Sequence, residues 1–297
     1  MTVTPDTMRD TCRFEGEAVA TAESDTGTEV RVITEPSVYL LGKQQINDAE
    51  LDRFLADHGV SWETDSEVAG EVITETAGRV CYMSFARPRP GGNSAYLTHI
   101  KEVGHGSVLE HAVWSLLITG VSRSLTHELV RHRAGFAYSQ LSQRYVDESV
   151  AEYVEPDMIA RDPELHAVWL EAVTHSHAAY VKLAELLNKK LADPQAAAAA
   201  MLPPDADRTT RRKSARQAAR SVLPNATETK ITVTANARAL RHFLEQRGSV
   251  FAEPEIRKLA NKLLDILQAE APNLFSDYEK TLLPDGTWAL STPYPKV

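Results

Sequence analysis

Three segments of the chain have the apolar pattern of β-strands. Between Val30 and Leu41 apolar and polar residues alternate on both sides of Pro36, which predicts one or two strands. Ala112 to Val121 is densely apolar and is expected to be a buried strand, and Thr229 to Ala235 is rich in β-branched residues. These segments are expected to form a central sheet.

Helical periodicity and capping residues predict that helices cover more of the chain than strands do. The predicted helices cover Ala49 to His58, Glu71 to Met83, Ser94 to Val103, a segment capped by Ser124 and reaching Arg133, Asp162 or Pro163 to about Leu191, Gln195 to Met201, Ala237 to Gln246, and Glu253 to Glu270. Pro272 is expected to end the last helix. The predicted fold class is α/β, a mixed central sheet flanked by helices, with a helical subregion at about residues 157–221.

Composition along the chain suggests one domain and one extension. Residues 1–28 are rich in Thr, Asp, Glu and Ala without an apolar period, so we expect a flexible N-terminal extension. Residues 29–297 are expected to form a single catalytic domain, with a loop from Pro88 to Gly92. No Gly-x-Gly-x-x-Gly follows a strand and no Gly-Lys-Ser/Thr loop occurs, so neither a Rossmann nor a P-loop site is expected.

The charge of the chain limits its partners. With a formal net charge of -9 and a pI near 5.6, the protein is not expected to bind nucleic acid. No apolar run approaches the ~18 residues of a membrane helix and no signal-peptide pattern occurs, so a soluble, cytoplasmic protein without a membrane partner is expected.

The cations must therefore act locally, and they gather in two places. One lies between Arg131 and Arg144. The other consists of Arg208, Arg211, Arg212, Lys213, Arg216 and Arg220. A solvated helix face explains Arg208 to Lys213 equally well.

Cysteine and histidine positions argue against disulfide and metal chemistry. Cys12 and Cys81 are far apart and lack a Cys-x-x-Cys partner, and Cys81 is expected to be buried on a helix. His127 and His132 are five residues apart rather than four, so they would point to different sides of a helix. No metal site is expected.

The strongest chemical feature is the run Arg131-His132-Arg133, followed after eight residues by Ser142-Gln143-Arg144-Tyr145. Three arginines in so short a stretch provide fixed positive charge and planar forks of N–H donors. Such groups suit a phosphate or an ionised heterocycle. The pattern therefore predicts a binding site for an anionic nucleotide.

This pattern resembles the signature of the flavin-dependent thymidylate synthases, in which Arg-His-Arg is followed by a serine and then Arg-Tyr. Other segments that resemble the family are His105 to His111, Thr119 to Arg123, Arg220 to Pro224 and Asn236 to Arg238. They follow the family's order and extend the resemblance over roughly Ala77 to Ile256. Eight residues separate Arg133 from Ser142 where the family usually has seven, so one extra residue lies near Gly135.

The resemblance implies a dUMP site. The residues implied to bind dUMP are Glu128, Arg131, Gln140, Ser142, Gln143, Arg144, Arg220 and Arg247. Arg247 matches the position that ionises the uracil ring and is the implied catalytic residue. Family members often have Gln where Glu128 stands, and a carboxylate there would accept from the uracil imide or orient an arginine. Ser142 is equally well explained as a helix cap.

The resemblance also implies a site for FAD. The residues implied to bind it are His105, Ser107, Arg131, His132, Arg133, Asn236, Arg238 and His242. Four residues separate Arg238 from His242, which places both on one helical face. Arg247 is nine residues beyond Arg238, about half a turn out of phase, so it should point to another part of the site or to a neighbouring subunit. A lone histidine is more often structural, which is the main interpretation of His132.

The implied activity is that of an FAD-dependent thymidylate synthase, which makes dTMP from dUMP with methylenetetrahydrofolate as one-carbon donor and NADPH as reductant. Neither cysteine has the sequence context of a nucleophile, so arginines would activate the uracil by fixed positive charge without a covalent bond. The family forms homotetramers with shared active sites. The alternative is a non-catalytic nucleotide-binding or nucleic-acid-binding protein that uses the same arginines for phosphate contacts.

Overall fold

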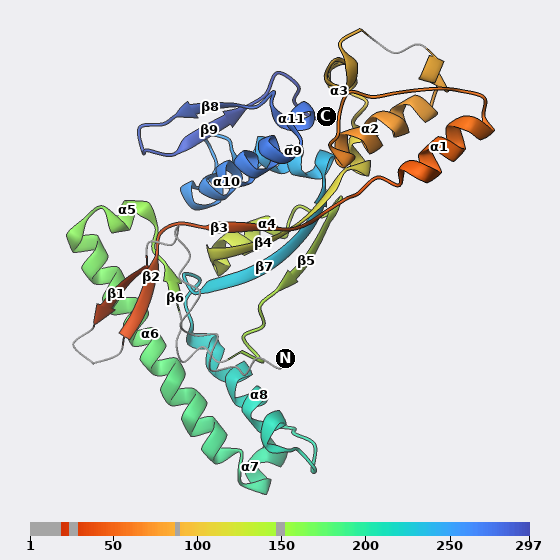
Figure 1. The fold of residues 1–297 in the computed structure, drawn as a ribbon. Coiled ribbons are helices and arrows are strands. Elements are labelled where there is room, and N and C mark those ends of the chain that lie inside the picture. The colour runs from red at the N-terminus through yellow and green to blue at the C-terminus, as the bar shows by residue number, and fades with distance from the viewer. Residues whose placement is uncertain (1–18, 24–28, 87–89, 147–151) are drawn as a thin grey trace, which may run out of the picture. The chain divides into compact units, whose positions relative to one another are not determined.

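The computed structural model describes residues 19–23, 29–86, 90–146 and 152–297 (Figure 1). Their contacts divide the chain into two compact units. The first consists of Met1–Ser37, Gly120–Arg123 and Ser142–Glu228, and the second of Val38–Thr119, Ser124–Leu141 and Thr229–Val297. The chain therefore passes between the two units several times. The single catalytic domain expected for residues 29–297 stays a prediction.

A small mixed sheet forms part of the first unit. Its strands are β1 (Val19–Glu23), β2 (Glu29–Ile33) and β6 (Glu152–Val154). β1 is antiparallel and β6 parallel to β2, and Val30 and Tyr153 are buried against Val173. β1 lies within the predicted flexible extension, so residues 19–23 have regular structure; residues 1–18 and 24–28 lie outside the described part.

Helices complete the first unit. They are α5 (Asp157–Ala160), α6 (Pro163–Lys190), α7 (Pro194–Ala199), α8 (Arg208–Ala219) and the 3-10 helix η4 (Arg220–Val222). Asp162 caps α6, because its side chain accepts from the backbone N–H groups of Glu164 and Leu165, and Pro163 suits the first turn. α6 packs along α8 (Figure 1). The helices predicted from Asp162 or Pro163 and near Gln195 are confirmed.

The second unit contains a four-stranded sheet. Its order is β3 (Ser37–Lys43), β4 (Val113–Ser122), β7 (Glu228–Asn236) and β5 (Phe136–Gln140). β5 is an edge strand and pairs antiparallel with β7, with Phe136 opposite Ala235. Alternate residues of β7, Ile231, Val233 and Ala235, are buried, as expected when one face of a sheet is covered. The predicted segment from Val30 to Leu41 forms two strands, β2 and β3, in different sheets.

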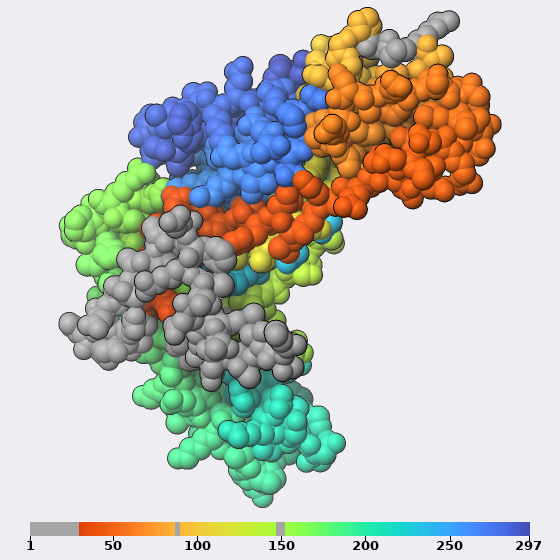
Figure 2. Space-filling model, viewed as in Figure 1, coloured from red at the N-terminus to blue at the C-terminus, as the bar shows by residue number. Residues whose placement is uncertain are grey.

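Helices and a hairpin make up the rest of this unit. They are α1 (Asp48–Asp57), α2 (Ala69–Val80), η2 (Ser84–Ala86), α3 (Gly92–Glu102), η3 (Gly106–His111), α4 (Arg123–Leu129), α9 (Ala237–Arg247), α10 (Pro254–Glu270), α11 (Pro272–Phe275), β8 (Glu279–Leu282) and β9 (Trp288–Ser291). α10 buries Ile256, Leu259, Leu263 and Leu267, which recur at helical spacing. The C-terminal helices, blue in Figure 2, adjoin the orange N-terminal helices, and α11 contacts α3.

The prediction of a helix capped by Ser124 and reaching Arg133 is wrong at both ends. α4 begins at Arg123 and ends at Leu129, so Ser124 lies inside it and Arg133 well beyond it. The Tyr138 hydroxyl, from β5, lies 2.9 Å from the carbonyl oxygen of Leu129 and 2.7 Å from that of His132. These carbonyls find a partner on another strand, so the chain leaves the helix there.

The end of α2 also differs from the prediction. α2 ends at Val80 instead of Met83, which has φ 45, outside the helical region. Cys81 is exposed rather than buried, because it is the C-cap residue, beyond the last buried residue, Arg79. Within the predicted loop from Pro88 to Gly92, residues 88 and 89 lie outside the described part, and Gly92 already begins α3.

The predicted fold class, α/β with a mixed sheet and many helices, is confirmed. In the described residues, none of the helices combines the length and the apolarity needed to cross a membrane. The described residues also contain no group of three or more His, Cys, Asp or Glu side chains placed to hold a metal ion.

Candidate functional site

The junction of β7 and α9 is the centre of the site in the second unit. Asn236 ends the strand and caps the helix, since its side-chain oxygen accepts from the backbone N–H of Ala239 at 2.9 Å. The helix therefore begins directly after the strand, as the sequence predicts. Arg238 and His242 follow on one face of α9, one turn apart.

A cavity of about 620 Å³ opens beside this junction. Its lining residues are Glu110, Ala134, Gly135, Asn236, Arg238, Ala239, His242, Glu245, Gln246, Lys296 and Val297. The volume lies within the range of cofactor and small-molecule sites. The cavity brings together Asn236, Arg238 and His242, all of which the sequence assigned to FAD.

A second cavity of about 360 Å³ adjoins the first. It is lined by Arg131, His132, Arg133, Ala134, Phe136, His242, Gln246 and Arg247. Both cavities share Ala134, His242 and Gln246, so the Arg-His-Arg run and the α9 residues surround one continuous region of the second unit. This is an arrangement of cations that suits an anionic ligand.

Arg247 is held at the edge of the smaller cavity by two partners. Its Nη1 donates to Oε2 of Glu128 at 2.5 Å, and its Nε donates to Nε2 of His132 at 3.0 Å. Glu128 thus orients an arginine, one of the two roles that the sequence left open for it. The contact between His132 and Arg247 was not predicted from the sequence.

His132 accepts this hydrogen bond because it is neutral. Burial, together with the positive charges of Arg247 and His242, lowers the pKa of His132 to about 4. At neutral pH the imidazole therefore offers a lone pair at Nε2. The structural interpretation of His132 is supported by this contact, although the side chain also lines the smaller cavity.

A second carboxyl group lies near Glu128. Burial, followed by the negative charge of Glu128 and a side-chain hydrogen bond with it, raises the pKa of Glu253. Glu253 immediately precedes α10. The two carboxyl groups and Arg247 therefore form a small charged cluster, which the sequence motifs did not indicate.

Arg238 and Arg247 point to different places, as their phase on α9 predicts. The Arg238 Nη1 donates to Oε1 of Glu110 at 2.6 Å, within the larger cavity. Arg238 also lies beside Gly106, where a Cβ would be 3.0 Å from the Arg238 Nε. Neither His105 nor Ser107, the neighbours of Gly106 in the chain, lines either cavity.

The extra residue near Gly135 is taken up by a turn. The Phe136 N–H donates to the carbonyl of Arg133 at 3.3 Å, and Gly135 has φ 73, a conformation that favours glycine. A Cβ on Gly135 would come within 2.7 Å of the Asn236 Nδ2. β5 pairs with β7 without a break directly after this turn, so the strand register is intact.

Gln140 is the last dUMP candidate of the second unit. At the end of β5 its Nε2 lies 3.1 Å from Thr126 Oγ1 and 3.3 Å from Thr229 Oγ1. The remaining dUMP candidates, Ser142, Gln143, Arg144 and Arg220, belong to the first unit.

In the first unit, the Ser142 to Tyr145 segment forms a tight turn. The Ser142 Oγ accepts from the backbone N–H of Arg144 at 3.4 Å, which agrees with the capping interpretation of this serine. The Nε2 of Gln143 and the Nε of Arg144 are buried and have no hydrogen-bond partner among the described residues. Native structures leave few buried donors without a partner, so these two atoms are exceptions within the described part of the chain.

Two residues of α8 contact this turn and were not assigned by the sequence. The Lys213 Nζ donates to the Tyr145 hydroxyl at 2.5 Å and lies 4.3 Å from the centre of its ring, while Arg216 donates to the Tyr145 carbonyl at 3.0 Å. The Lys213 hydrogen bond and charge lower the pKa of Tyr145. Lys213, Arg216 and Arg220 recur at positions i, i+3 and i+7, a signal that would have placed them on one helix face.

The fold is α/β, and cationic side chains line both cavities of the second unit, an arrangement that suits an anionic ligand. A family model described as "Thymidylate synthase complementing protein" matches residues 65–273. A flavin-dependent thymidylate synthase of Mycolicibacterium gilvum (strain PYR-GCK) is 52% identical over 242 residues, which are 81% of this chain and 92% of that protein. The one of Corynebacterium diphtheriae is 44% identical over 260 residues, 86% of this chain and 98% of that protein.

The chain belongs to the family of the flavin-dependent thymidylate synthases. The resemblance inferred from the motifs and the prediction of an enzyme, a methyltransferase, are thereby confirmed.

Solved structures give a consistent picture of the fold. A UMP/dUMP methylase, PolB, from Streptomyces cacaoi, bound with 5-Br dUMP, superposes with a TM-score of 0.54. The match covers 82% of this chain and 95% of that chain at 18% sequence identity. At this identity the likeness concerns the fold.

Proposed function

We propose that the protein makes dTMP from dUMP, with methylenetetrahydrofolate as one-carbon donor, FAD as the flavin and NADPH as reductant. Family membership and the relatives named flavin-dependent thymidylate synthase support this proposal. The observation that carries it is Arg247, held by Glu128 and His132 at the edge of a cavity lined by other cations.

The larger cavity fits a flavin in size and in chemistry. About 620 Å³ is enough for a large cofactor, and Arg238 and His242 offer cationic and polar groups to a pyrophosphate. We assign FAD binding to His105, Ser107, Arg131, His132, Arg133, Asn236, Arg238 and His242. When bound, the flavin supplies the redox chemistry, and the protein supplies orientation and positive charge.

Arginine donors would activate the uracil of dUMP. A guanidinium has five N–H donors, and Arg247 uses three of them on His132, the Glu128 carboxylate and, at 3.4 Å, the Glu128 carbonyl. Two remain for a substrate. Arg247 would thus draw electron density from the ring without a covalent bond. Cys81, exposed at the end of α2, lines neither cavity.

The other dUMP contacts follow the resemblance to the family. We assign them to Glu128, Arg131, Gln140, Ser142, Gln143, Arg144 and Arg220. The buried, unpartnered Nε2 of Gln143 and Nε of Arg144 support their assignment, because a phosphate or a uracil carbonyl would satisfy these donors.

We further propose a cytoplasmic homotetramer with shared active sites. β5 is an edge strand, and Arg131, Arg133 and Gln140, at or before its ends, are exposed in the single chain. Exposure of several candidate site residues supports completion of the site by a neighbouring subunit. Mass measurement in solution by light scattering tests this; a monomer would contradict it.

The test of the function is the visible absorption spectrum of the purified protein, reduced anaerobically, before and after addition of dUMP and methylenetetrahydrofolate. Flavin that reoxidises while stoichiometric dTMP forms would support the proposal. A colourless protein whose RNA or DNA binding falls steeply with salt would support the non-catalytic alternative.

A further inference from the structure

Residues 292–297, which we call the strap, end against the larger cavity. Lys296 and Val297 are among its lining residues. Val297 is 7% exposed, and its carbonyl carbon would be 2.8 Å from a Cβ on Gly106. The cavity keeps about 620 Å³ with the strap in place, so the strap forms a wall and does not fill the space.

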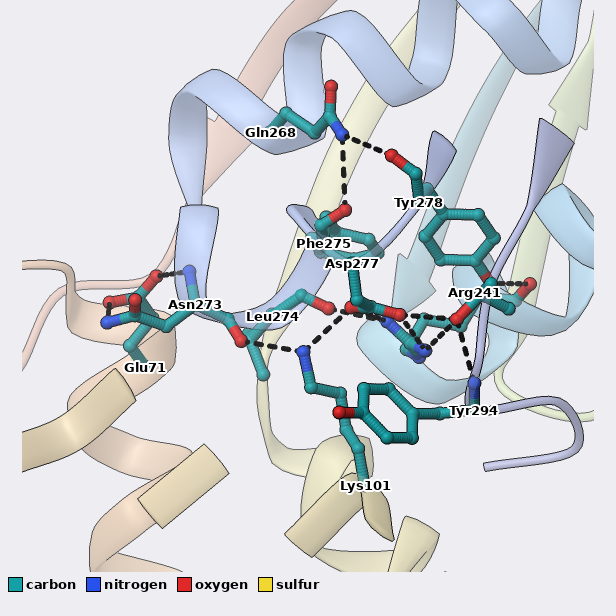
Figure 3. Close-up of polar contacts among 11 residues, drawn as sticks. Glu71, Lys101, Arg241, Gln268, Asn273, Leu274, Phe275, Asp277, Tyr278 and Tyr294 are labelled. Carbon is teal, nitrogen blue, oxygen red and sulfur yellow. Dashed lines mark hydrogen bonds and ion pairs between the residues drawn. The ribbon is translucent and has the colours of Figure 1, made fainter. Parts of the chain in front are cut away.

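A buried polar network holds the inner end of the strap (Figure 3). Asp277 accepts two hydrogen bonds from Arg241 at 2.8 Å each and one from Lys101 at 2.7 Å. The Thr292 Oγ1 donates to Asp277 at 2.5 Å and accepts from the Tyr294 N–H at 3.1 Å. The Lys101 Nζ lies 5.5 Å from the centre of the Tyr294 ring.

This network ties the strap to the helix that carries the site. Arg241 belongs to α9 and immediately precedes His242, which lines both cavities. Asp277 therefore links the two elements, because it accepts hydrogen bonds from Arg241 of α9 and from Thr292 of the strap.

The outer end of the strap is held in an unfavourable backbone conformation. Lys296 has φ 65, which residues with a Cβ rarely adopt. Its backbone N–H donates to Oε2 of Glu245, on α9, at 2.9 Å. Strained residues of this kind persist where surrounding contacts enforce them, and they concentrate at ligand clamps.

We propose that the strap is a positioning element that forms one wall of the flavin cavity and increases the affinity of the protein for FAD. The proposal rests on the proposed function. Lys296 is the residue on which it depends, because the hydrogen bond to Glu245 and the left-handed backbone direct Val297 toward Gly106.

The test compares two substitutions that both remove the lysine side chain. In Lys296→Pro the residue has no N–H for Glu245 and cannot adopt positive φ, so the strap is released. In Lys296→Gly the N–H is kept and positive φ is favourable, so the strap stays closed. FAD affinity is measured by quenching of flavin fluorescence, and melting temperature checks the fold. Hydrogen exchange of residues 290–297 is followed with and without FAD.

We expect the wild type and Lys296→Gly to bind FAD with similar affinity. Lys296→Pro should bind FAD about tenfold more weakly, because the released strap must be ordered when FAD binds. FAD should slow exchange in residues 290–297 of the first two proteins only. Equal affinities in the two variants would overturn the proposal, because the effect would then be absent or due to the ammonium group. A wild-type protein that binds no FAD would overturn the proposed function and the strap together.

Discussion

Two arginines of α9, six residues apart, lie in opposite surroundings. Arg241 is 2% exposed, and its two Nη atoms donate to both carboxylate oxygens of Asp277 and to the carbonyl of Leu274. The Arg247 side chain is 22% exposed and is held by one oxygen of Glu128 and by a neutral His132.

The difference lies in how far each guanidinium is buried and in which of its donors a ligand could reach. Burial tends to raise the pKa of Asp277, but the hydrogen bonds and charges of Arg241 and Lys101 outweigh it and lower the pKa to about 2. Asp277 is therefore ionised, and Arg241 and Lys101 share its one negative charge. Arg247 keeps donors that no protein group uses, so it is oriented yet available. Arg241 also has one donor without a partner, its Nε, but this atom is buried and out of reach of a ligand. Burial therefore gives Arg241 a structural role, whereas the partly exposed Arg247 suits the role in dUMP activation that we propose for it.

Of the substitutions proposed here, Arg247→Ala should have the largest effect, a loss of dTMP formation. Without the guanidinium, the uracil loses its fixed positive charge, and dTMP formation should fall about 10²- to 10³-fold. FAD should remain bound and the melting temperature should stay within a few degrees, because Arg247 lies at a cavity edge. Single-turnover formation of dTMP measures the effect. Arg247→Lys serves as a control that keeps charge but loses the planar fork; wild-type turnover in the alanine variant would refute the role of Arg247.

Asp277→Asn should act on stability instead. It leaves Arg241 and Lys101 buried with unbalanced charge, which should cost about 3 kcal/mol of unfolding free energy. Urea unfolding measures this. Asp265→Asn is the matched control, because Asp265 pairs with Lys280 at the surface, with 62% of its side chain exposed, and should cost less than about 0.5 kcal/mol. Similar losses in both variants would show that the buried network is not specially important.

Acid titration should separate the two regions by pH. The pKa of His132 is about 4 in the folded protein, below its ordinary value of 6.5. Between pH 6.5 and pH 4 the unfolded chain therefore binds a proton at this histidine and the folded protein does not. As the pH is lowered through this range, the free energy of unfolding decreases. Asp277 contributes about 2 kcal/mol above its ordinary pKa of 3.8, lost as pH falls toward 2. The midpoint of urea unfolding is measured from pH 7 to pH 3. Its dependence on pH should be weaker than in the wild type above pH 4 for His132→Asn and below pH 4 for Asp277→Asn. An unchanged pH dependence in the variants would argue against both assignments.

Glu128→Gln should give the smallest effect. Glutamine retains an acceptor for Arg247 but loses the charge, so kcat should fall about tenfold with little change in the KM for dUMP. The pKa of Glu253, raised by burial and by Glu128, should fall toward its ordinary value. Steady-state kinetics test the first point, with Glu270→Gln, which affects only the partner of Lys43, as a control. A KM change without a kcat change would assign Glu128 to substrate contact.

Much of the fold could be predicted because its signals are local. The caps at Asp162 and Asn236 and the periodic apolar residues of α10 act within a few positions along the chain. The Arg-His-Arg run could also be identified from the sequence. The spacing of Arg238 and Arg247 on one helix predicted that their side chains point in different directions. The end of α4 was not, because it depends on the Tyr138 hydroxyl of a separate strand.

By itself the sequence determined the residue types of the candidate site, the strand β7 and the helix α9 that carry part of it, and the family. It did not predict β5, which carries Gln140, or the end of α4. Only the tertiary structure decided which partners the side chains have. Arg247 meets Glu128 and His132 across 119 and 115 positions, and Arg241 meets Asp277 across 36. Such pairs form where packing brings distant segments together. The surrounding burial then determines whether a guanidinium is out of reach of a ligand, as at Arg241, or available to one, as at Arg247.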